Sequence, residues 1–224
     1  HLAERLIADG HEVVVIDNFA TGKPNDLAHL ADEPRFSIHQ ADVADIESIR
    51  PFFIGVDHVY HLAAMADIVP SIENPMTYHR ANVDGTISVL ESARAAAVKR
   101  FVYVASSSCY GIPDTYPTPE DAPARPMYPY ALTKRLGEEL VKHWAQVYEL
   151  PAISLRFFNV YGPRSRTSGT YGAVFGVFLA QKLANKPLTV VGDGTQKRDF
   201  VYVDDVVDAF IKATNSKIKN QIFN

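Results

Sequence analysis

Short β-branched runs alternate with longer segments of helical periodicity along most of this chain. The clearest run, 12–17, is almost wholly apolar, and the runs that follow it leave room for a helix between each pair. Strands that are apolar on both sides belong to a sheet buried on both faces, and helical connections between them make the strands parallel. The pattern therefore predicts an α/β fold with a doubly wound parallel sheet.

The predicted elements divide the chain into two parts. Strands are predicted at 12–17, 36–43, 57–64, 100–105 and 152–159, with helices over 2–7, 76–98 and 130–148. After Tyr161 the loops lengthen, and strands at 188–191 and 199–203 alternate with helices near 172–185 and 204–214. We therefore predict a main domain over 1–160 and a smaller, incomplete C-terminal lobe over 161–224, with one strand returning to the sheet.

Composition excludes several function classes. The chain has 224 residues, of which 47% are hydrophobic, and no apolar run approaches the roughly 20 residues that span a bilayer. Its 22 basic and 26 acidic residues give a formal net charge of −4, without the basic surplus of a nucleic-acid-binding protein. The single cysteine, Cys109, can make no internal disulfide, which fits a cytoplasmic setting. We expect neither a membrane nor a nucleic acid as partner.

Acidic residues follow the first two predicted strands. A carboxylate at Asp17 can accept two hydrogen bonds from a ribose diol and would repel a 2′-phosphate, which favours NAD over NADP. Asp42, at the end of the second predicted strand, could bond an adenine amino group. Both residues could instead cap a turn. The two interpretations stay open for Asp17, whereas a simple turn is favoured for Asp42 taken alone.

Tyr130 and Lys134 form a Tyr-x-x-x-Lys pair near the start of a predicted helix. A spacing of four places both side chains on one helix face, and an ammonium near a phenol stabilises the phenolate and lowers its pKa. With 11 tyrosines in the chain, about 0.5 matches are expected by chance, so a lone match says little. The context strengthens it, because the preceding strand ends in Ser106-Ser107-Ser108, and a serine there can bond both the phenol and a substrate hydroxyl.

Two further polar residues stand where an anionic ligand could bind. Arg198 offers a rigid fork suited to a diphosphate, and Asn159 ends the last predicted strand of the main sheet. Taken singly, a surface arginine and a turn asparagine are the favoured interpretations. No metal site is predicted, because His58 and His61 are three apart in a predicted strand and point to opposite faces.

Six segments, in this order along the chain, resemble the NAD-dependent nucleotide-sugar epimerase/dehydratase family of the extended short-chain dehydrogenase/reductase superfamily. The resemblance covers essentially the whole chain. The segments are Val15-Ile16-Asp17-Asn18, His61-Leu62-Ala63-Ala64, Ala105-Ser106-Ser107-Ser108-Cys109-Tyr110-Gly111, Tyr130-Ala131-Leu132-Thr133-Lys134, Arg156-Phe157-Phe158-Asn159-Val160-Tyr161-Gly162-Pro163-Arg164 and Arg198-Asp199-Phe200-Val201-Tyr202-Val203.

The resemblance implies NAD as cofactor and a role for each candidate residue. Tyr130 would be the catalytic base, Lys134 would orient the nicotinamide ribose, and Ser106 would be the catalytic serine. The implied cofactor-binding residues are Asp17, Asn18, Asp42, Val43, Leu62, Ala63, Ala64, Ser106, Tyr130, Lys134 and Phe158. The implied substrate-binding residues are Ser107, Ser108, Tyr130, Asn159 and Arg198.

The resemblance also implies an architecture. Residues 1–160 would form a Rossmann-type NAD-binding domain, whose first strand and glycine-rich phosphate loop would precede His1. Residues 161–224 would be part of a substrate-binding lobe that continues beyond Asn224. A homodimer is expected through helices 76–98 and 130–148, although amphipathic pattern alone does not distinguish this from packing within one chain.

The expected reaction is epimerisation of a UDP-sugar at C4 through a transient 4-keto sugar. Family members that eliminate water or decarboxylate resemble one another in carrying acidic residues where this chain has Ser107 and Ser108, which disfavours elimination. A nucleotide-sugar reductase or 4,6-dehydratase and a non-catalytic dinucleotide sensor stay open as alternatives. The set of Tyr130, Lys134 and Ser106 argues against the sensor. The sugar stays open among UDP-glucose or UDP-galactose, their N-acetyl forms and the uronic acids.

Overall fold

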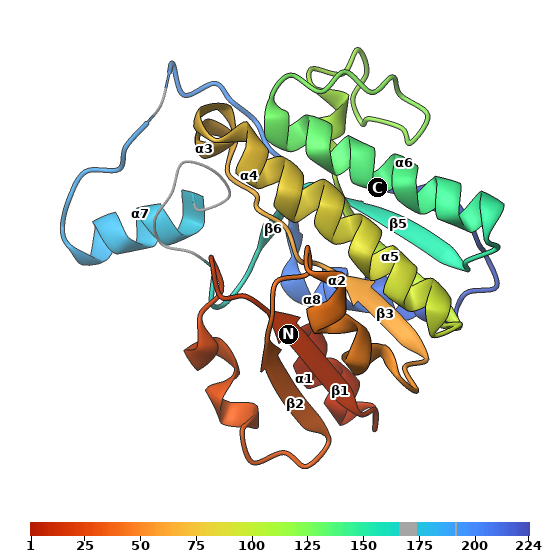
Figure 1. The fold of residues 1–224 in the computed structure, drawn as a ribbon. Coiled ribbons are helices and arrows are strands. Elements are labelled where there is room, and N and C mark those ends of the chain that lie inside the picture. The colour runs from red at the N-terminus through yellow and green to blue at the C-terminus, as the bar shows by residue number, and fades with distance from the viewer. Residues whose placement is uncertain (166–173, 191) are drawn as a thin grey trace.

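The computed structural model describes residues 1–165, 174–190 and 192–224, and it confirms the predicted α/β fold (Figure 1). The strands are β1 Val13–Asp17, β2 Phe36–Gln40, β3 His58–His61, β4 Arg100–Ser106, β5 Ala152–Phe157, β6 Asn159–Tyr161, β7 Phe200–Tyr202 and β8 Gln221–Phe223. The α-helices are α1 Leu2–Ala8, α2 Ile46–Ile49, α3 Ile68–Glu73, α4 Pro75–His79, α5 Gly85–Ala95, α6 Pro129–Val147, α7 Val174–Leu183 and α8 Val203–Asn215. Shorter helical segments are η1 Pro24–Leu30, η2 Arg50–Phe53, η3 Arg80–Asp84 and η4 Ser107–Tyr110, of which η3 is a π-helical turn.

Every strand pair in the described part of the chain is parallel. The main sheet has the order β3-β4-β5-β8, while β1 pairs with β2 and β6 with β7. The strand predicted at 152–159 is therefore two strands. The chain leaves the main sheet at Phe158, and β6 pairs with β7 in the register Asn159 to Phe200. The strand predicted at 188–191 was wrong for residues 188–190, which have no regular structure, and residue 191 lies outside the described residues.

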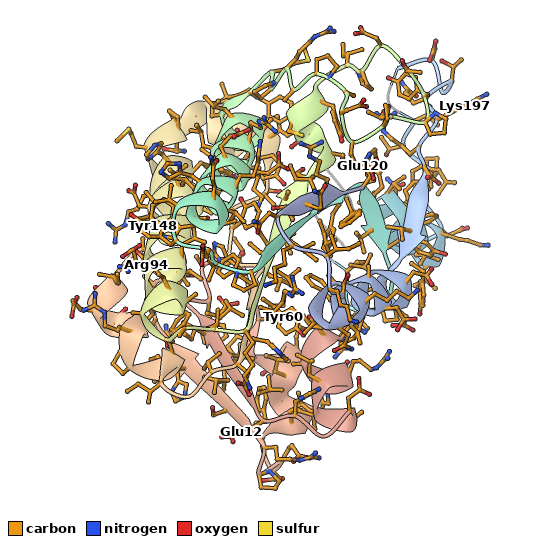
Figure 2. All side chains as sticks on the ribbon, turned by 90° about the vertical axis from the view of Figure 1, so that its right-hand side faces the viewer. Glu12, Tyr60, Arg94, Glu120, Tyr148 and Lys197 are labelled. Carbon is orange, nitrogen blue, oxygen red and sulfur yellow. The ribbon has the colours of Figure 1, made fainter. Side chains whose placement is uncertain are left out.

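The main sheet is buried between two layers of helices, which explains its apolar sequence. Along β4, Phe101 and Tyr103 point to the core formed with α5 and α6, whereas Val102 points to the core formed with α8. Figure 2 shows the sheet between these two layers. Full burial of such a side chain contributes roughly 1.5–3 kcal/mol, so the central strand alone supplies a large share of the fold's stability. On the outer side of the first layer, the Arg94 guanidinium lies 5.0 Å from the ring centroid of Tyr148.

In this layer α6 lies very close to the sheet, and the segment from α4 to α5 changes its helical geometry. Gly137 in α6 lies directly over Tyr103, where a Cβ atom would collide with the Tyr103 hydroxyl. The single helix predicted over 76–98 is interrupted by the π-helical turn η3, which separates α4 from α5. Such turns are frequent at functional sites, because they rotate one face of a helix relative to the other. Among the described helices, none is both long and apolar enough to cross a membrane.

Candidate active site

Tyr130 and two serines meet at the carboxyl end of β4. Ser106 ends β4 and accepts a hydrogen bond from the Ser108 backbone N–H at 3.2 Å, which begins η4. Tyr130 lies in the first turn of α6 and donates its hydroxyl proton to Ser106 Oγ at 3.4 Å. Ser106 Oγ and Ser108 Oγ are 2.8 Å apart. Ser107 lies in the same turn and is partly buried. The fold thus gathers the predicted hydroxyl groups at one point.

Lys134 follows one turn later on α6 and is buried. Its ammonium lies 4.5 Å from the ring centroid of Tyr103. Burial lowers the pKa of Lys134 to about 7, and the Glu138 carboxylate opposes that shift. A buried ammonium is costly unless hydrogen-bond acceptors surround it. The hydroxyl groups of a bound ribose would supply the acceptors, so this residue fits a dinucleotide.

The pKa of Tyr130 is not lowered as its sequence spacing predicted. Burial raises the pKa of Tyr130, the Asp67 carboxylate adds to the rise, and the hydrogen bond to Ser106 opposes it. A second hydrogen bond, with Ser108, also opposes the rise. Desolvation of the phenolate therefore outweighs the two hydrogen bonds that stabilise it.

Asp17 and Asn18 shape the turn at the carboxyl end of β1. Asp17 Oδ1 accepts from the Phe19 backbone N–H at 2.7 Å, and Asn18 Oδ1 accepts from the Ala20 backbone N–H at 3.0 Å. Asp17 Oδ2 faces Gly22, where a Cβ atom would come within 3.0 Å of it. Asp17 is therefore a turn cap, and its second oxygen can still accept a hydrogen bond from a ribose.

The structure places Asp42 beyond the end of β2, which is shorter than the strand predicted at 36–43. β2 ends at Gln40, and Asp42 Oδ1 caps the next turn by accepting from the Ala44 backbone N–H at 2.9 Å. Asp42 Oδ2 lies 3.4 Å from Arg80 Nη2. The turn interpretation is thus correct for Asp42, and Val43 follows it as a partly buried residue packed on the main core.

The segment Leu62-Ala63-Ala64 follows β3 and is held by a residue that the sequence analysis missed. Asn82 in η3 accepts from the Met65 backbone N–H at 2.8 Å and donates to the Met65 carbonyl at 3.0 Å. Its amide also donates to Thr133 Oγ1 on α6 at 2.9 Å. An asparagine in the interior of a predicted helix was the available indication, because such residues disfavour helical geometry unless their side chains bond elsewhere.

The candidate substrate-binding residues lie where β6 and β7 pair. Asn159 donates from Nδ2 to the Asp199 carbonyl at 2.9 Å, which brings it beside the segment that carries Arg198. Arg198 is exposed and donates from Nη1 to the Lys197 carbonyl at 2.8 Å. Phe158 is 37% exposed, and its ring centroid lies 6.4 Å from that of Tyr110. Phe158 directly follows Phe157, which lies opposite Ser106 of the hydroxyl cluster.

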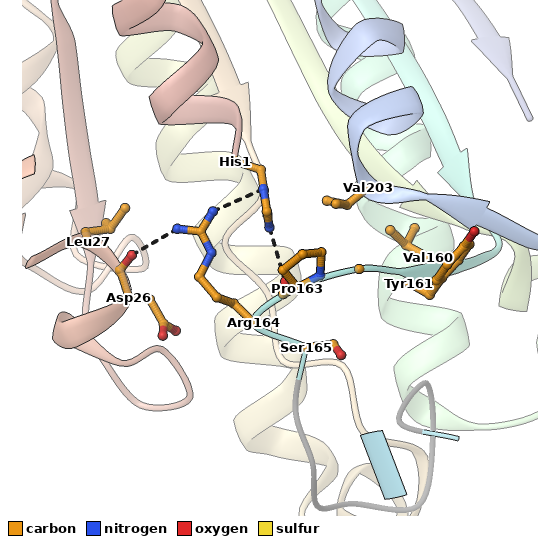
Figure 3. A pocket seen from close by; sticks show the side chains of 10 residues that line it. His1, Asp26, Leu27, Val160, Tyr161, Pro163, Arg164, Ser165 and Val203 are labelled. Atoms are coloured by element: carbon orange, nitrogen blue, oxygen red, sulfur yellow. Dashed lines mark hydrogen bonds between the residues drawn. The ribbon is translucent and has the colours of Figure 1, made fainter. Parts of the chain in front are cut away.

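A pocket of about 350 Å³ lies apart from these residues, between the start of α1 and the end of β6 (Figure 3). Arg164 spans it, donating to the Asp26 carbonyl at 3.3 Å and lying 3.0 Å from His1 Nδ1. The same guanidinium makes two bonds to the Glu4 carboxylate, at 2.8 and 2.6 Å. The charged groups of the pocket thus satisfy one another, and none of the predicted catalytic residues lines it. Within the described residues, no group of three or more potential metal ligands gathers.

His61 makes the stability of the site dependent on pH. It is fully buried beside Thr86, with 2.9 Å between Nε2 and Oγ1, and burial lowers its pKa from 6.5 to about 3. Because the unfolded chain binds this proton between pH 6.5 and 3 and the folded protein does not, stability falls as the pH drops through that range. Replacing His61 with Phe is expected to make the drop in the free energy of unfolding between pH 6.5 and 3 smaller by about 2 kcal/mol. Unfolding measured as a function of pH tests this. An unchanged slope would show that His61 takes up its proton in the folded state.

Comparisons with known proteins agree with the geometry. The chain is 37% identical to the UDP-glucose 4-epimerase of Mycolicibacterium smegmatis over 226 residues, covering 100% of this chain and 72% of that protein. The solved UDP-glucose 4-epimerase of Thermotoga maritima, with UDP-glucose, superposes with a TM-score of 0.93 at 32% identity, covering 100% of this chain and 72% of that one. The NAD complex of the Thermus thermophilus UDP-glucose 4-epimerase gives 0.89 at 33% identity, with the same shares of 100% and 72%. The sequence matches the description "NAD dependent epimerase/dehydratase family" over residues 1–224, and the chain belongs to that family, whose cofactor is NAD.

Proposed function

We propose that this chain catalyses the NAD-dependent epimerisation of a UDP-sugar at C4 through a transient 4-keto sugar. The observation that carries the proposal is the hydroxyl cluster of Tyr130 and Ser106 beside the buried ammonium of Lys134. Family membership and the similarity to UDP-glucose 4-epimerases support the substrate class and the position of the reaction.

The roles of the chain's residues follow from this geometry. NAD, when bound, supplies the centre that accepts a hydride from C4 of the sugar and later returns it. Tyr130 Oη takes the proton of the sugar 4-hydroxyl, directly or through Ser106 Oγ, and gives it back after the ketone has turned over. Lys134 donates to the ribose hydroxyls and so orients the nicotinamide end of the cofactor. Asp17 accepts from the second ribose, and the remaining predicted cofactor-binding residues line the strand ends between these two points.

On the substrate side, Asn159 and Arg198 are proposed to hold the diphosphate while the 4-keto sugar rotates. The pairing of β6 with β7 supports this, because it brings both residues to the same end of a two-stranded sheet. Residues 161–224 would then form part of the substrate-binding lobe. A guanidinium that donates from Nη1 to a backbone carbonyl can also donate two parallel hydrogen bonds to a phosphate.

The test is product analysis on the complete protein with UDP-glucose, UDP-galactose and their N-acetyl forms. We expect interconversion of one C4-epimeric pair without net consumption of NAD⁺, with a small transient absorbance from the reduced cofactor. Accumulation of a 4-keto-6-deoxy sugar would establish the alternative, a 4,6-dehydratase. One observation favours that alternative, because the Asp67 carboxylate acts on Tyr130 and would be a second acidic group.

The cofactor preference can be tested at Asp17. Asp17→Asn keeps an oxygen for the Phe19 backbone N–H but removes the charge, so the turn should survive while NAD⁺ binding weakens by about 10-fold. The same change should strengthen NADP⁺ binding, because repulsion of the 2′-phosphate is lost. Titration of both cofactors measures the two effects, and an equal affinity of the unchanged protein for both would contradict the role of Asp17.

A homodimer through the helical layer that contains α4, α5 and α6 is also proposed. Large apolar side chains are exposed along α3, α4 and the first half of α6, namely Val69, Ile72, Met76, Leu132 and Leu136. A contiguous apolar surface of this kind is typical of a subunit interface. Sedimentation of the complete protein and of a Leu132→Lys variant would test it, with a monomeric variant as the expected result.

We further propose a cytoplasmic location, which the buried free thiol of Cys109 supports.

A further inference from the structure

A buried ion pair lies one helical turn beyond Lys134, and no chemical role has been given to it above. Glu138 on α6 and Arg156 on β5 are 1% and 3% exposed. Two parallel hydrogen bonds join them, from Arg156 Nε to Glu138 Oε2 at 2.7 Å and from Arg156 Nη2 to Glu138 Oε1 at 2.7 Å. Arg135 adds a third bond to Oε1 at 2.5 Å. A paired fork of this kind fixes the relative orientation of two elements as well as their distance.

The same guanidinium reaches the segment that carries the catalytic serine. Arg156 Nη1 donates to the Tyr110 hydroxyl and, at 2.9 Å, to the Glu120 carbonyl. The Arg156 guanidinium also lies 4.7 Å from the ring centroid of Tyr110. Tyr110 ends η4, the short helix whose first cap is Ser106. One buried side chain thus connects α6, β5 and η4.

The Tyr110 hydroxyl continues the network outward. It donates to Asn224 Oδ1 at 2.7 Å, and the Asn224 backbone N–H donates to Glu120 Oε1 at 3.2 Å. The hydrogen-bond network of the ion pair therefore extends through Tyr110 to Asn224. A buried ion pair with all its hydrogen bonds made is often no more stabilising than apolar residues of the same volume. Its contribution here is therefore to the geometry of the segments that it connects.

The catalytic contact depends on how these elements are placed. Tyr130 and Glu138 lie eight residues apart on α6, where Tyr130 is partly buried and Glu138 buried, and the hydroxyl of Tyr130 is 3.4 Å from Ser106 Oγ. That distance is at the long limit of a hydrogen bond, so a small shift of α6 against η4 would break it. The ion pair of Glu138 and Arg156 joins α6 to β5, and the bond from Arg156 to Tyr110 extends the connection to η4.

We propose that Glu138 and Arg156 are positioning residues, which hold α6 against η4 so that Tyr130 Oη meets Ser106 Oγ. The inference rests on the proposed function, since it concerns the same site. Neither residue touches the reacting atoms. Loss of the pair should therefore lower kcat and leave the KM for the UDP-sugar and the affinity for NAD⁺ nearly unchanged.

The first test compares Glu138→Gln with Glu139→Gln in the complete protein with NAD bound. Both variants lose one negative charge from neighbouring positions of α6, but Glu139 is 43% exposed and pairs with Arg135 and Lys142 on its own helix. We expect kcat to fall about 10- to 100-fold for Glu138→Gln, since a displacement of about 1 Å can cost that much, and to stay unchanged for Glu139→Gln. Arg156→Lys keeps the charge but loses the fork, and should resemble Glu138→Gln.

A second variant distinguishes a loss of positioning from a loss of folding. Removing one partner of a buried pair strongly destabilises a protein, whereas replacing both with apolar residues is often neutral. The double variant Glu138→Met/Arg156→Met should therefore fold and bind NAD⁺ while kcat still falls about 10- to 100-fold. Wild-type kcat in this folded double variant would overturn the proposal.

Crystal structures of the folded double variant give a measurement that does not depend on activity. The distance from Tyr130 Oη to Ser106 Oγ should exceed about 4 Å, beyond hydrogen-bond range, compared with 3.4 Å in the unchanged protein. If the unchanged protein turns over no UDP-sugar, the proposed function fails, and this distance alone decides the positioning role. An unchanged distance would overturn that role.

Discussion

Tyr130→Phe is expected to reduce kcat about 10²- to 10⁴-fold, the range that general acid–base catalysis contributes. The substitution removes one oxygen and keeps the ring, so α6 and its packing should be preserved. Lys134 and Asp17 remain in place, so NAD⁺ should bind with nearly unchanged affinity. Steady-state turnover of the UDP-sugar and a cofactor titration on the same preparation measure both effects. Near wild-type turnover would show that the epimerase mechanism proposed here is wrong.

Ser106→Ala is the matched comparison for Tyr130→Phe. It removes the acceptor of the Tyr130 hydroxyl bond, but water can partly replace a hydroxyl relay, so the loss of kcat should be smaller. The pH profile of kcat distinguishes the two variants. The hydrogen bond from Tyr130 to Ser106 opposes the effect of burial on the phenol's pKa, so Ser106→Ala should move the Tyr130 ionisation to higher pH. In Tyr130→Phe that ionisation should be absent.

Lys134→Met is expected to abolish turnover while making the free protein more stable. Burial lowers the pKa of Lys134 from 10.5 to about 7, which means that the folded protein holds the ammonium at a cost in free energy. At roughly 1.4 kcal/mol per pKa unit, and with part of the cost offset by the contact with Tyr103, the gain should be on the order of 3 kcal/mol. Methionine has a similar length and leaves no buried charge.

The pH dependence of this gain provides its own control. Below about pH 7 the folded Lys134 is charged and the full cost applies, so the advantage of the methionine variant should be largest there. The advantage should fade as the pH rises from 7 toward 10.5, because the folded lysine is then neutral while the unfolded one still binds its proton. NAD⁺ should raise the melting temperature of the unchanged protein more than that of Lys134→Met. A variant that is both less stable and fully able to bind NAD⁺ would contradict the fit of Lys134 to the cofactor.

Much of the fold could be predicted because its strands are buried on both sides. The sequence pattern located six of the eight described strands, β1 to β5 and β7, and the long helix α6, since an apolar run between helical segments has few other interpretations. The break at Phe158 could not be predicted in this way. Phe157, Phe158 and Val160 are all apolar, and only the pairing partner shows that β6 belongs to another sheet.

The candidate site was predictable where spacing along one element decides the geometry. Tyr130 and Lys134 share a helix face, and Ser106 ends a strand, so their convergence follows from local structure. The pKa of Tyr130 was not predictable, because it depends mainly on burial of the phenol by elements from other parts of the chain. Glu138 looked like one of several helical glutamates. Its burial follows from packing against Arg156, which lies on a strand 18 residues further along the chain.

The pairing of β8 with β5 has a consequence for how the protein is made. Ser154 lies opposite Ile222, so β8 can pair with β5 only after all the residues between them have been synthesised. Until then β5 presents an unpaired edge, the kind of surface on which nascent chains associate with one another. Tyr110 also lacks its bond to Asn224 during that interval. The network around Tyr110 is therefore completed only after Asn224 has been made, although Ser106 and Tyr130 are made much earlier.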